Sequence, residues 1–510
     1  QAQDDSLGFP PGFPQCAAYT VLSRRLIRSG EPMSLAAKLT RHKSVEALQA
    51  ELGSRRDFRR VLGVWQLTAI GLGGIIGVGI FVLAGQQAAA NAGPAVALSF
   101  IIAGIASTAA ALCYAEFAGL IPVTGSAYTY GYAVLGELPA WLIGWDLLLE
   151  YALIVAAVAS GWSGYVVNLL AAFGLHLPVA LQGAPGTGDG HAFNLVAAIA
   201  AFGVAVLLTL RTEWGARFNT AIVAVKVVAV ILVIGVGAMY VDPANWHPFV
   251  PDRVVDANGV GHFGYKGIAT AAAVVFFAVF GYDTLTTAAE ESKNPQRDLP
   301  RAILLSLGIS MALYIAITLV ITGMVSYTQL GNDAPVAMAF EARGMKWIGA
   351  AISATAIASI LSVIFAFMLA AARIWFALSR DGLLPAWFAH THPRYGTPHR
   401  TTLALGAFTA LVAGFFPIGE VAKLVNIGVL SAFIVICASV IVLRRRKPDL
   451  PRAFRTPWVP AVPLIGILFS VWLLSELAAV TWMVFLLWVA IGLVIYFAYG
   501  IRRSKLAGGA

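Results

Sequence analysis

Among the charged residues inside long apolar stretches of this sequence, where charge is costly, Lys226, Glu150 and Asp283 stand out. Lys226 lies in one such stretch, Glu150 follows Asp146 by one helical turn in another, and Asp283 lies in a third. An ionised side chain at the centre of a membrane costs about 2.5–3.5 kcal/mol to insert, so such residues usually have a function. Lys226, Glu150 and Asp283 are therefore predicted to bind and release protons. A buried structural ion pair between Lys226 and Glu150 is the alternative.

Glycine interrupts the first long apolar stretch, in the run GLGGIIGVG at residues 71–79. Each glycine inside a helix costs about 1 kcal/mol relative to alanine, so a helix is expected to open here and leave backbone groups unpaired. Because hydrocarbon offers no hydrogen-bond partners, a broken helix survives in a membrane only where protein buries it or where it lines a cavity. The run therefore predicts a place where a solute or an ion meets backbone groups.

A second interruption is expected in the sixth apolar stretch, where Gly281 and Asp283 follow a Phe-rich segment. Proteins built from inverted membrane repeats carry broken helices at corresponding positions of their two halves. The sixth stretch lies five stretches after the first, so stretches 1–5 and 6–10 are predicted to be the two repeats. Close helix packing is the alternative explanation for Gly281.

Membrane-spanning helices are the elements expected to position these residues, because the composition is typical of a membrane protein. Hydrophobic residues make up 59% of the 510 residues, charged residues only 12%, and the mean hydropathy is +0.80. A membrane-spanning helix needs about 20 apolar residues, and about twelve such stretches occur. They are continuous rather than alternating, which disfavours a transmembrane barrel and predicts an all-α polytopic membrane protein. The expected spans are residues 62–84, 94–119, 138–169, 193–211, 218–240, 264–289, 302–325, 347–378, 402–416, 421–443, 459–477 and 479–501.

Basic residues precede the first span and recur in every second loop after it. Cytoplasmic loops carry the excess of Lys and Arg, so both termini are expected in the cytoplasm. This topology explains the net charge of +9, which leaves no surplus that would indicate nucleic-acid binding. The predicted parts are a cytoplasmic segment 1–60, a ten-helix core 61–443, a basic cytoplasmic loop 444–458, two appended helices 459–501 and a cytoplasmic tail 502–510. Residues 1–32 are expected not to belong to the natural protein, because Met33 begins a more ordinary cytoplasmic helix.

Several classes of protein are disfavoured by what the sequence lacks. It has no HExxH pattern and no GxxxxGK[ST] loop, which argues against a metalloprotease and against a nucleotide-driven pump. Its histidines lie in tails and loops rather than within spans, so neither a metal site nor another cofactor is expected. The chain is therefore predicted not to be an enzyme, while a channel or a nutrient sensor on the same scaffold stays open.

Five short motifs together resemble a known family of membrane proteins. They are GIIGVGIF at 74–81, GSAYTY at 125–130, GWDLLLEY at 144–151, AAEESKNPQRDLP at 288–300 and RDGLLP at 380–385. The sequence resembles the amino acid/polyamine/organocation (APC) transporter superfamily, and among its members the bacterial relatives of the cationic amino acid transporters. The resemblance implies a LeuT-like five-plus-five inverted repeat with broken spans 1 and 6. It also implies secondary active import of amino acids across the bacterial cytoplasmic (inner) membrane by alternating access.

The resemblance places a substrate L-amino acid at the two breaks. Its carboxylate would meet the N–H groups of Gly77, Val78 and Gly79, at the positive end of the second half of span 1. Its ammonium would be held by carbonyls freed in both spans, and an aromatic ring would close over it. Phe277 matches the family's gate position. At the position of Val78, relatives often carry a small polar residue, so this sequence departs from the family there. The predicted substrate-binding residues are Ile75, Gly77, Val78, Gly79, Phe277, Ala278, Phe280 and Gly281.

Lys226 matches the lysine that, in this branch of the family, replaces a bound sodium ion between spans 1, 5 and 8. A lysine there could brace the broken first helix while it is protonated and release it on losing the proton, so we expect proton symport, in which Glu150 and Asp283 help to set the proton affinity of Lys226. An obligate amino acid exchanger, which needs no proton, is the alternative. Side-chain selectivity is expected from pocket walls in spans 3, 8 and 10, with a broad neutral range favoured. Membrane lipid is an expected partner, and a small membrane-protein partner stays open.

Overall fold

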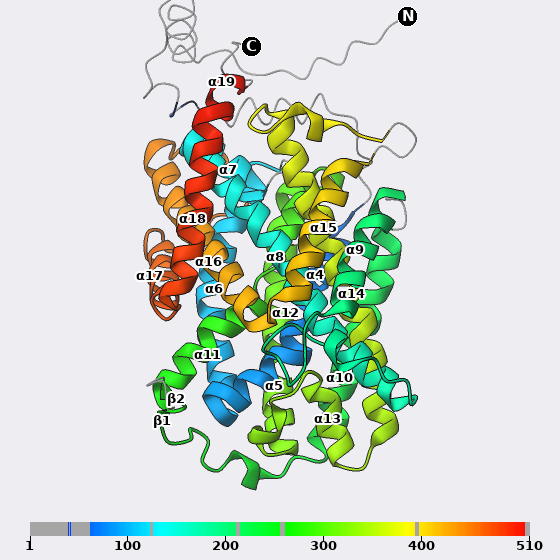
Figure 1. Ribbon diagram of the computed structural model, residues 1–510. Coiled ribbons are helices and arrows are strands. Elements are labelled where there is room, and N and C mark those ends of the chain that lie inside the picture. The colour runs from blue at the N-terminus through cyan, green and yellow to red at the C-terminus, as the bar shows by residue number, and fades with distance from the viewer. Residues whose placement is uncertain are drawn as a thin grey trace, which may run out of the picture.

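The computed structural model describes residues 39, 41, 62–122, 126–210, 215–255, 261–392 and 397–504. The predicted cytoplasmic segment 1–60, with residues 1–32, lies outside this part except for Leu39 and Arg41, and so does the tail from residue 505. The described chain forms an elongated bundle of helices, most of which run between its two ends (Figure 1). The upper end in Figure 1, which carries α19 (Ile501–Arg503), is the end predicted to face the cytoplasm.

Each apolar stretch expected from the sequence contains a helix. Among the described residues, seven helices are long and apolar enough to cross a membrane, and four shorter apolar helices accompany them. The prediction of an all-α polytopic membrane protein is confirmed. The helices in spans 1–6 are α4 (Val64–Ile75), η1 (Gly79–Leu83), α5 (Ala84–Gln87), α6 (Val96–Leu120), α8 (Glu137–Ala172), α9 (Leu195–Leu210), α10 (Gly215–Ala238), α11 (Gly264–Val279) and η6 (Tyr282–Glu291). Those in spans 7–12 are α12 (Pro295–Met324), α14 (Lys346–Arg380), α15 (His399–Phe415), α16 (Ile418–Arg446), α17 (Ala461–Ser475) and α18 (Ala479–Ile495).

Short elements connect these helices. Two strands of two residues each, β1 and β2, pair as an antiparallel hairpin before α11. The connecting elements are η2 (Ala88–Ala92), η3 (Gly93–Ala95), α7 (Ser126–Val134), η4 (Val179–Leu181), η5 (Pro243–Trp246), β1 (Val254–Val255), β2 (Gly261–His262), η7 (Tyr327–Leu330), α13 (Pro335–Ala342), η8 (Ala386–Ala389) and η9 (Tyr496–Gly500).

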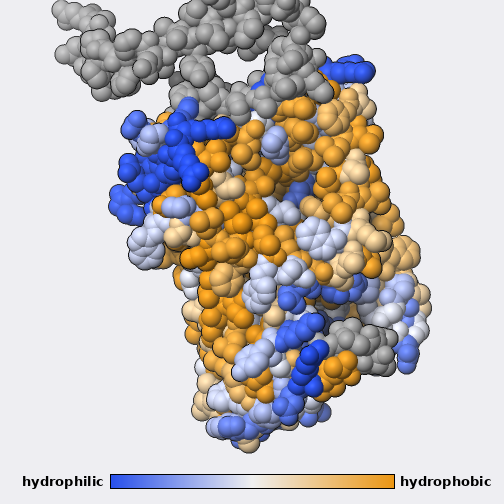
Figure 2. All heavy atoms as spheres, turned by 90° about the vertical axis from the view of Figure 1, so that its left-hand side faces the viewer, coloured by the Kyte–Doolittle hydropathy of each residue, from blue (hydrophilic) through white to orange (hydrophobic). Residues whose placement is uncertain are grey.

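The outer surface of the bundle is apolar around its middle. Figure 2 shows the side formed by α17 and α18, where hydrophobic side chains form a broad belt and hydrophilic residues gather toward the two ends. Large apolar side chains of these two helices are exposed, among them Leu468, Leu487 and Val494. A belt of this kind is what hydrocarbon requires of a multi-pass membrane protein.

Helices of the two predicted repeats pack against each other in a regular way. α6 lies against α12, α8 against α14, and α9 against α15, so each contacts the helix that lies five spans later in the chain. This is the arrangement expected when two repeats are related by a pseudo-two-fold axis. Spans 1 and 6 also pack against each other, because α4 lies against η6.

Both of these spans are interrupted. α4 ends at Ile75, Ile76 is extended, and the helix resumes as the π-helical η1 at Gly79. α11 ends at Val279, and after Gly281, which has a φ of +116°, the chain continues as the 3₁₀-helix η6. A positive φ is open to glycine without steric cost, so Gly281 permits the turn in the second break.

A cluster of ion pairs joins helices at the end of the bundle that is predicted to face the cytoplasm. Glu116 of α6, which is 2% exposed, accepts two hydrogen bonds of 2.8 Å from the Arg444 guanidinium at the end of α16. The backbone N–H of Thr456 donates to the same carboxylate at 2.8 Å, and Arg452 lies 3.0 Å from it. The cluster thus joins span 2, span 10 and the loop that follows.

Candidate functional site

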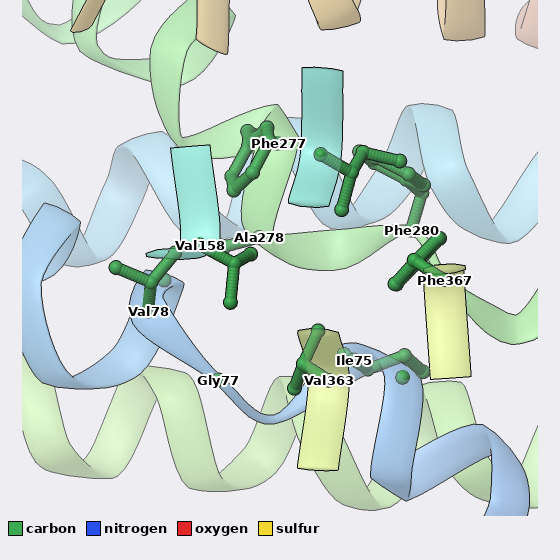
Figure 3. A pocket seen from close by; sticks show the side chains of 12 residues that line it. Ile75, Gly77, Val78, Val158, Phe277, Ala278, Phe280, Val363 and Phe367 are labelled. Carbon is green, nitrogen blue, oxygen red and sulfur yellow. The ribbon is translucent and has the colours of Figure 1, made fainter. Parts of the chain in front are cut away.

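A small pocket lies between the two interruptions (Figure 3). The non-helical link of span 1 passes through Gly77, and the end of α11 faces it with Phe277, Ala278 and Phe280. Every side chain drawn around the pocket in Figure 3 contains carbon atoms only. The lining residues are Gly74, Ile75, Gly77, Val78, Gly79, Ile154, Val158, Phe277, Ala278, Phe280, Val363 and Phe367.

Among the described residues that line this pocket, polar groups come from the backbone, at two helix ends. The N–H groups of Gly77, Val78 and Gly79 precede the first hydrogen bonds of the second half of span 1, which Ile80 and Phe81 donate to the Gly77 carbonyl at 3.2 and 3.4 Å. The first N–H groups of a helix have no partner within it and carry the positive end of the helix dipole. This end of the pocket is therefore suited to a carboxylate.

Carbonyl groups from the last turn of α11 lie opposite. Because α11 ends at Val279, no helical N–H follows to bond the carbonyls of Phe277 and Ala278. The carbonyl of Val279 accepts a hydrogen bond of 2.9 Å from the Ser107 hydroxyl on α6. The free carbonyl oxygens of this turn carry the negative end of the helix dipole, which suits an ammonium group.

Residues of spans 5 and 7 hold the end of α4. The Lys226 ammonium donates to the carbonyls of Gly73 and Ile76 at 2.9 and 2.8 Å, and to the Ser362 hydroxyl of α14 at 3.4 Å. The Tyr314 hydroxyl of α12 donates to the Ile75 carbonyl at 2.7 Å. The Ile75 carbonyl, which we expected to be open to the substrate ammonium, thus already has a protein partner.

The ion pair between Lys226 and Glu150, the alternative from the sequence, is wrong, because the lysine has other partners. Lys226 is 1% exposed and bonds only carbonyls and a hydroxyl, whereas Glu150 Oε2 has no hydrogen-bond partner among the described residues. Freed carbonyls of the broken helix are strong acceptors. They accept the ammonium hydrogen bonds that a carboxylate would accept in an ion pair.

Asp146 and Glu150 of span 3 and Asp283 of span 6 lie near one another beside the pocket. Asp146, Glu150, Ile154 and Val158 follow each other at intervals of one helical turn, so the two carboxyl groups continue the face of α8 that lines the pocket. Asp283 accepts a hydrogen bond from the Tyr151 hydroxyl. Within the described chain, no group of three or more His, Cys, Asp or Glu side chains is placed to hold a metal ion.

Two aromatic rings connect Asp283 with the pocket, because its hydrogen-bond partner Tyr151 packs against Phe367 of the pocket wall. The Phe367 ring, which lines the pocket, packs edge-on against Tyr151 at 5.4 Å and against Phe280 at 6.3 Å. Phe277, the expected gate, packs edge-on against Phe280 at 5.9 Å and points into the pocket (Figure 3). The aromatic cluster of Phe277, Phe280 and Phe367 thus covers the pocket on the side of α11 and α14.

All but one of the residues predicted to bind substrate line the pocket. The exception is Gly281, which lies against the backbone of Gly74 and whose carbonyl accepts hydrogen bonds from Thr284. Among the expected walls, spans 3 and 8 contribute, and no residue of α16 lines the pocket.

The sequence reasoning missed Gly74 and four side chains of the walls, namely Ile154, Val158, Val363 and Phe367. The spacing of the sequence could have predicted the two residues on α8. Ile154 and Val158 continue the series of Asp146 and Glu150 at intervals of four residues, on the same helix face. Val363 and Phe367 are also one turn apart, but they lie in a uniformly apolar stretch that offers no signal.

The chain is similar to known proteins over nearly the whole helix bundle that surrounds this pocket. The model of a family described as amino acid permease matches residues 62–496. Two proteins of Bacillus subtilis (strain 168) are each 45% identical to the chain. One is a methylthioribose transporter, aligned over 92% of this chain and 99% of its own length, and the other is the branched-chain amino acid permease BcaP, aligned over 91% and 98%. Cationic amino acid transporter 4 of Homo sapiens is 36% identical over 82% of this chain and 64% of its own length.

Proposed function

The chain belongs to the amino acid permease family of the APC superfamily, and on this premise we propose that it imports amino acids with apolar side chains by proton symport. Membership of this family makes it a multi-pass membrane permease and not an enzyme. The substrate class, the direction of transport across the cytoplasmic membrane and the coupling to protons constitute the proposal.

The apolar walls of the pocket are the observation that carries the substrate class. Ile154, Val158, Val363 and Phe367 present only carbon atoms to the site. A lysine or arginine side chain bound here would lose its water and find no acceptor among these walls, which costs several kcal/mol. Apolar side chains of a size like leucine or valine gain from the same burial, at about 25 cal/mol per Å².

The backbone groups at the two breaks supply the part of the site common to all amino acids. We place the carboxylate at the N–H groups of Gly77, Val78 and Gly79, and the ammonium at the carbonyls of Phe277 and Ala278, because these groups line the pocket at helix ends. The two groups would then meet the helix ends of matching sign. The name of BcaP, a branched-chain amino acid permease, supports an apolar substrate.

Methylthioribose is a second candidate substrate, because an equally similar relative is named as its transporter. Methylthioribose has neither a carboxylate nor an ammonium group. It would therefore leave the charge-matched helix ends at Gly77 and Ala278 without the partners that an amino acid offers them. The pocket thus favours the amino acid.

Proton coupling is assigned to Lys226, with Glu150 and Asp283 as further proton-binding groups. While it is protonated, the ammonium can donate to Gly73, Ile76 and Ser362 at once, and losing a proton removes one of these donors. Proton release would therefore loosen the end of α4 next to the substrate carboxylate. One positive charge that moves through about 100 mV releases about 2.3 kcal/mol, which sustains a gradient of about fiftyfold.

Uptake into liposomes tests the proposal. The purified protein is reconstituted, and uptake of radiolabelled leucine, valine, alanine, lysine, arginine and methylthioribose is measured with and without an inward proton gradient. Accumulation of the apolar amino acids only with the gradient is expected. Flux that requires internal amino acid and ignores pH would establish the exchanger, binding without flux would indicate a sensor, and accumulation of methylthioribose alone would replace the substrate class.

A further inference from the structure

Asn426 of α16 binds the backbone of the broken span 6. Its Nδ2 donates to the carbonyl of Ala273 at 2.6 Å and to that of Val274 at 3.3 Å. The residue is completely buried, and its Oδ1 has no hydrogen-bond partner among the described residues. The side chain therefore interacts with the protein through its donor groups alone.

The arrangement repeats that of Lys226 in the first half of the chain. Lys226 reaches from span 5 to the Gly73 carbonyl of span 1 across 153 residues, and Asn426 reaches from span 10 to the Ala273 carbonyl of span 6 across 153 residues. In both cases the last helix of a predicted repeat donates side-chain N–H groups to carbonyls of the first helix of that repeat. The chemical difference is that the lysine can lose a proton and the asparagine cannot.

The carbonyls bound by Asn426 lie one turn before the pocket. In an α-helix the carbonyls of Ala273 and Val274 accept the N–H groups of Phe277 and Ala278. Both of these later residues line the pocket, and their carbonyls are those assigned to the substrate ammonium. Phe433, two turns further along α16, packs edge-on against Phe276 in the same turn at 5.6 Å.

We propose that Asn426 is a positioning residue for substrate binding, the proton-independent counterpart of Lys226, which holds the last turn of α11 in the geometry that binds the ammonium. This inference rests on the proposed function. Because the amide does not titrate, a proton lost from Lys226 frees span 1 while span 6 stays fixed to span 10. The coupling would then be asymmetric, with span 1 as the part that responds to protons.

Asn426→Leu tests the inference, because leucine has the same number and branching of side-chain heavy atoms as asparagine and no hydrogen-bond donor. Ser439→Ala is the matched control, since Ser439 is also buried on α16 and its hydroxyl has no partner among the described residues. Half-saturation is measured for leucine exchange in liposomes at the same pH on both sides, so that no proton gradient is involved. Loss of a neutral hydrogen bond predicts a half-saturation about three- to tenfold higher in Asn426→Leu and unchanged in Ser439→Ala.

Hydrogen exchange provides the second measurement, in case Asn426→Leu folds poorly. Faster exchange confined to residues 273–280 is expected in Asn426→Leu and not in the control. With a gradient, Asn426→Leu keeps the pH dependence of the wild type, which a proton-carrying residue would not. An unchanged half-saturation, or faster exchange spread evenly over all helices, would overturn the inference. Absence of proton-driven accumulation in the wild type would instead contradict the proposed function.

Discussion

Gly74 and Gly281 lie against each other, backbone to backbone, where the two broken helices cross. A Cβ atom on Gly74 would lie 2.9 Å from the Gly281 carbonyl oxygen, and one on Gly281 would lie 3.0 Å from the Gly74 carbonyl oxygen. Real Cβ atoms do not approach backbone atoms so closely without displacing them. The contact therefore fixes the distance between the N–H groups of span 1 and the carbonyls of span 6 that face each other across the pocket.

Gly281→Ala is expected to abolish transport. The Cβ would meet the Gly74 backbone at a φ of +116°, and a side chain in such a conformation costs about 1–3 kcal/mol before any clash. Transport and the unfolding temperature in detergent are both measured. Gly308→Ala in α12 is the control, because nothing lies within 4 Å of the added Cβ, and it should preserve transport. Normal leucine uptake by Gly281→Ala would show that the crossing of the breaks can relax.

Lys226→Ala is expected to lose gradient-driven accumulation. The carbonyls of Gly73 and Ile76 lose their donor, and no group is left there to carry a proton. Accumulation should fall from about fiftyfold toward onefold, as measured by leucine uptake at several pH gradients. Lys423→Ala on α16, which removes a partly exposed lysine paired with Glu420, should behave like the wild type. If Lys226→Ala kept pH-dependent accumulation, Lys226 would be only a structural brace.

Val158→Leu is expected to change the side-chain preference of the site. The added methylene narrows the pocket beside Ile154 and Phe367, and one methylene in an apolar pocket is worth about 1–3 kcal/mol. The ratio of kcat/KM for leucine to that for alanine should fall by about tenfold or more. Val228→Leu, at a position 55% exposed on α10, makes the same change outside the pocket and should leave the ratio unchanged. Equal losses for both substrates would place Val158 outside the side-chain subsite.

Glu116→Gln is expected to destabilise the fold without changing substrate preference. The neutral amide keeps the shape of the carboxylate but weakens the bonds from Arg444 and Thr456, and hydrogen bonds to charged groups are worth about 1.5–3 kcal/mol. The unfolding temperature of the purified protein measures the loss. Glu420→Gln, which removes a surface pair with Lys423, should cost about 1 kcal/mol or less. A Glu116→Gln variant as stable as the wild type would show that the cluster contributes specificity rather than stability.

Much of the fold follows from short-range features of the sequence. Long apolar runs predict the spans, because hydrocarbon requires every backbone group to be bonded within a helix. Gly77 and Gly79 predict the break in span 1, because glycine lowers the stability of the helix at its own position. The acidic pair Asp146 and Glu150 is placed on one helix face by its spacing alone.

The partners of the buried polar side chains were not open to such reasoning. The sequence is compatible with an ion pair between Lys226 and Glu150, but Lys226 donates instead to the carbonyls of Gly73 and Ile76. Nothing in the sequence indicates that Asn426 binds the Ala273 carbonyl, because a single amide in an apolar span is equally compatible with many neighbours. Each of these contacts joins residues about 150 positions apart, so it depends on how the repeats pack.

By itself, the sequence determined that this protein is an all-α membrane protein with helices that open at Gly77 and near Gly281. These properties depend on the residues within one or two helical turns. Only the tertiary structure decided that Gly281 contacts Gly74 rather than the pocket, and that Val363 and Phe367 of α14 complete the apolar wall. Such contacts arise from close packing between helices that are distant in the chain, and packing selects partners by shape and distance rather than by local sequence.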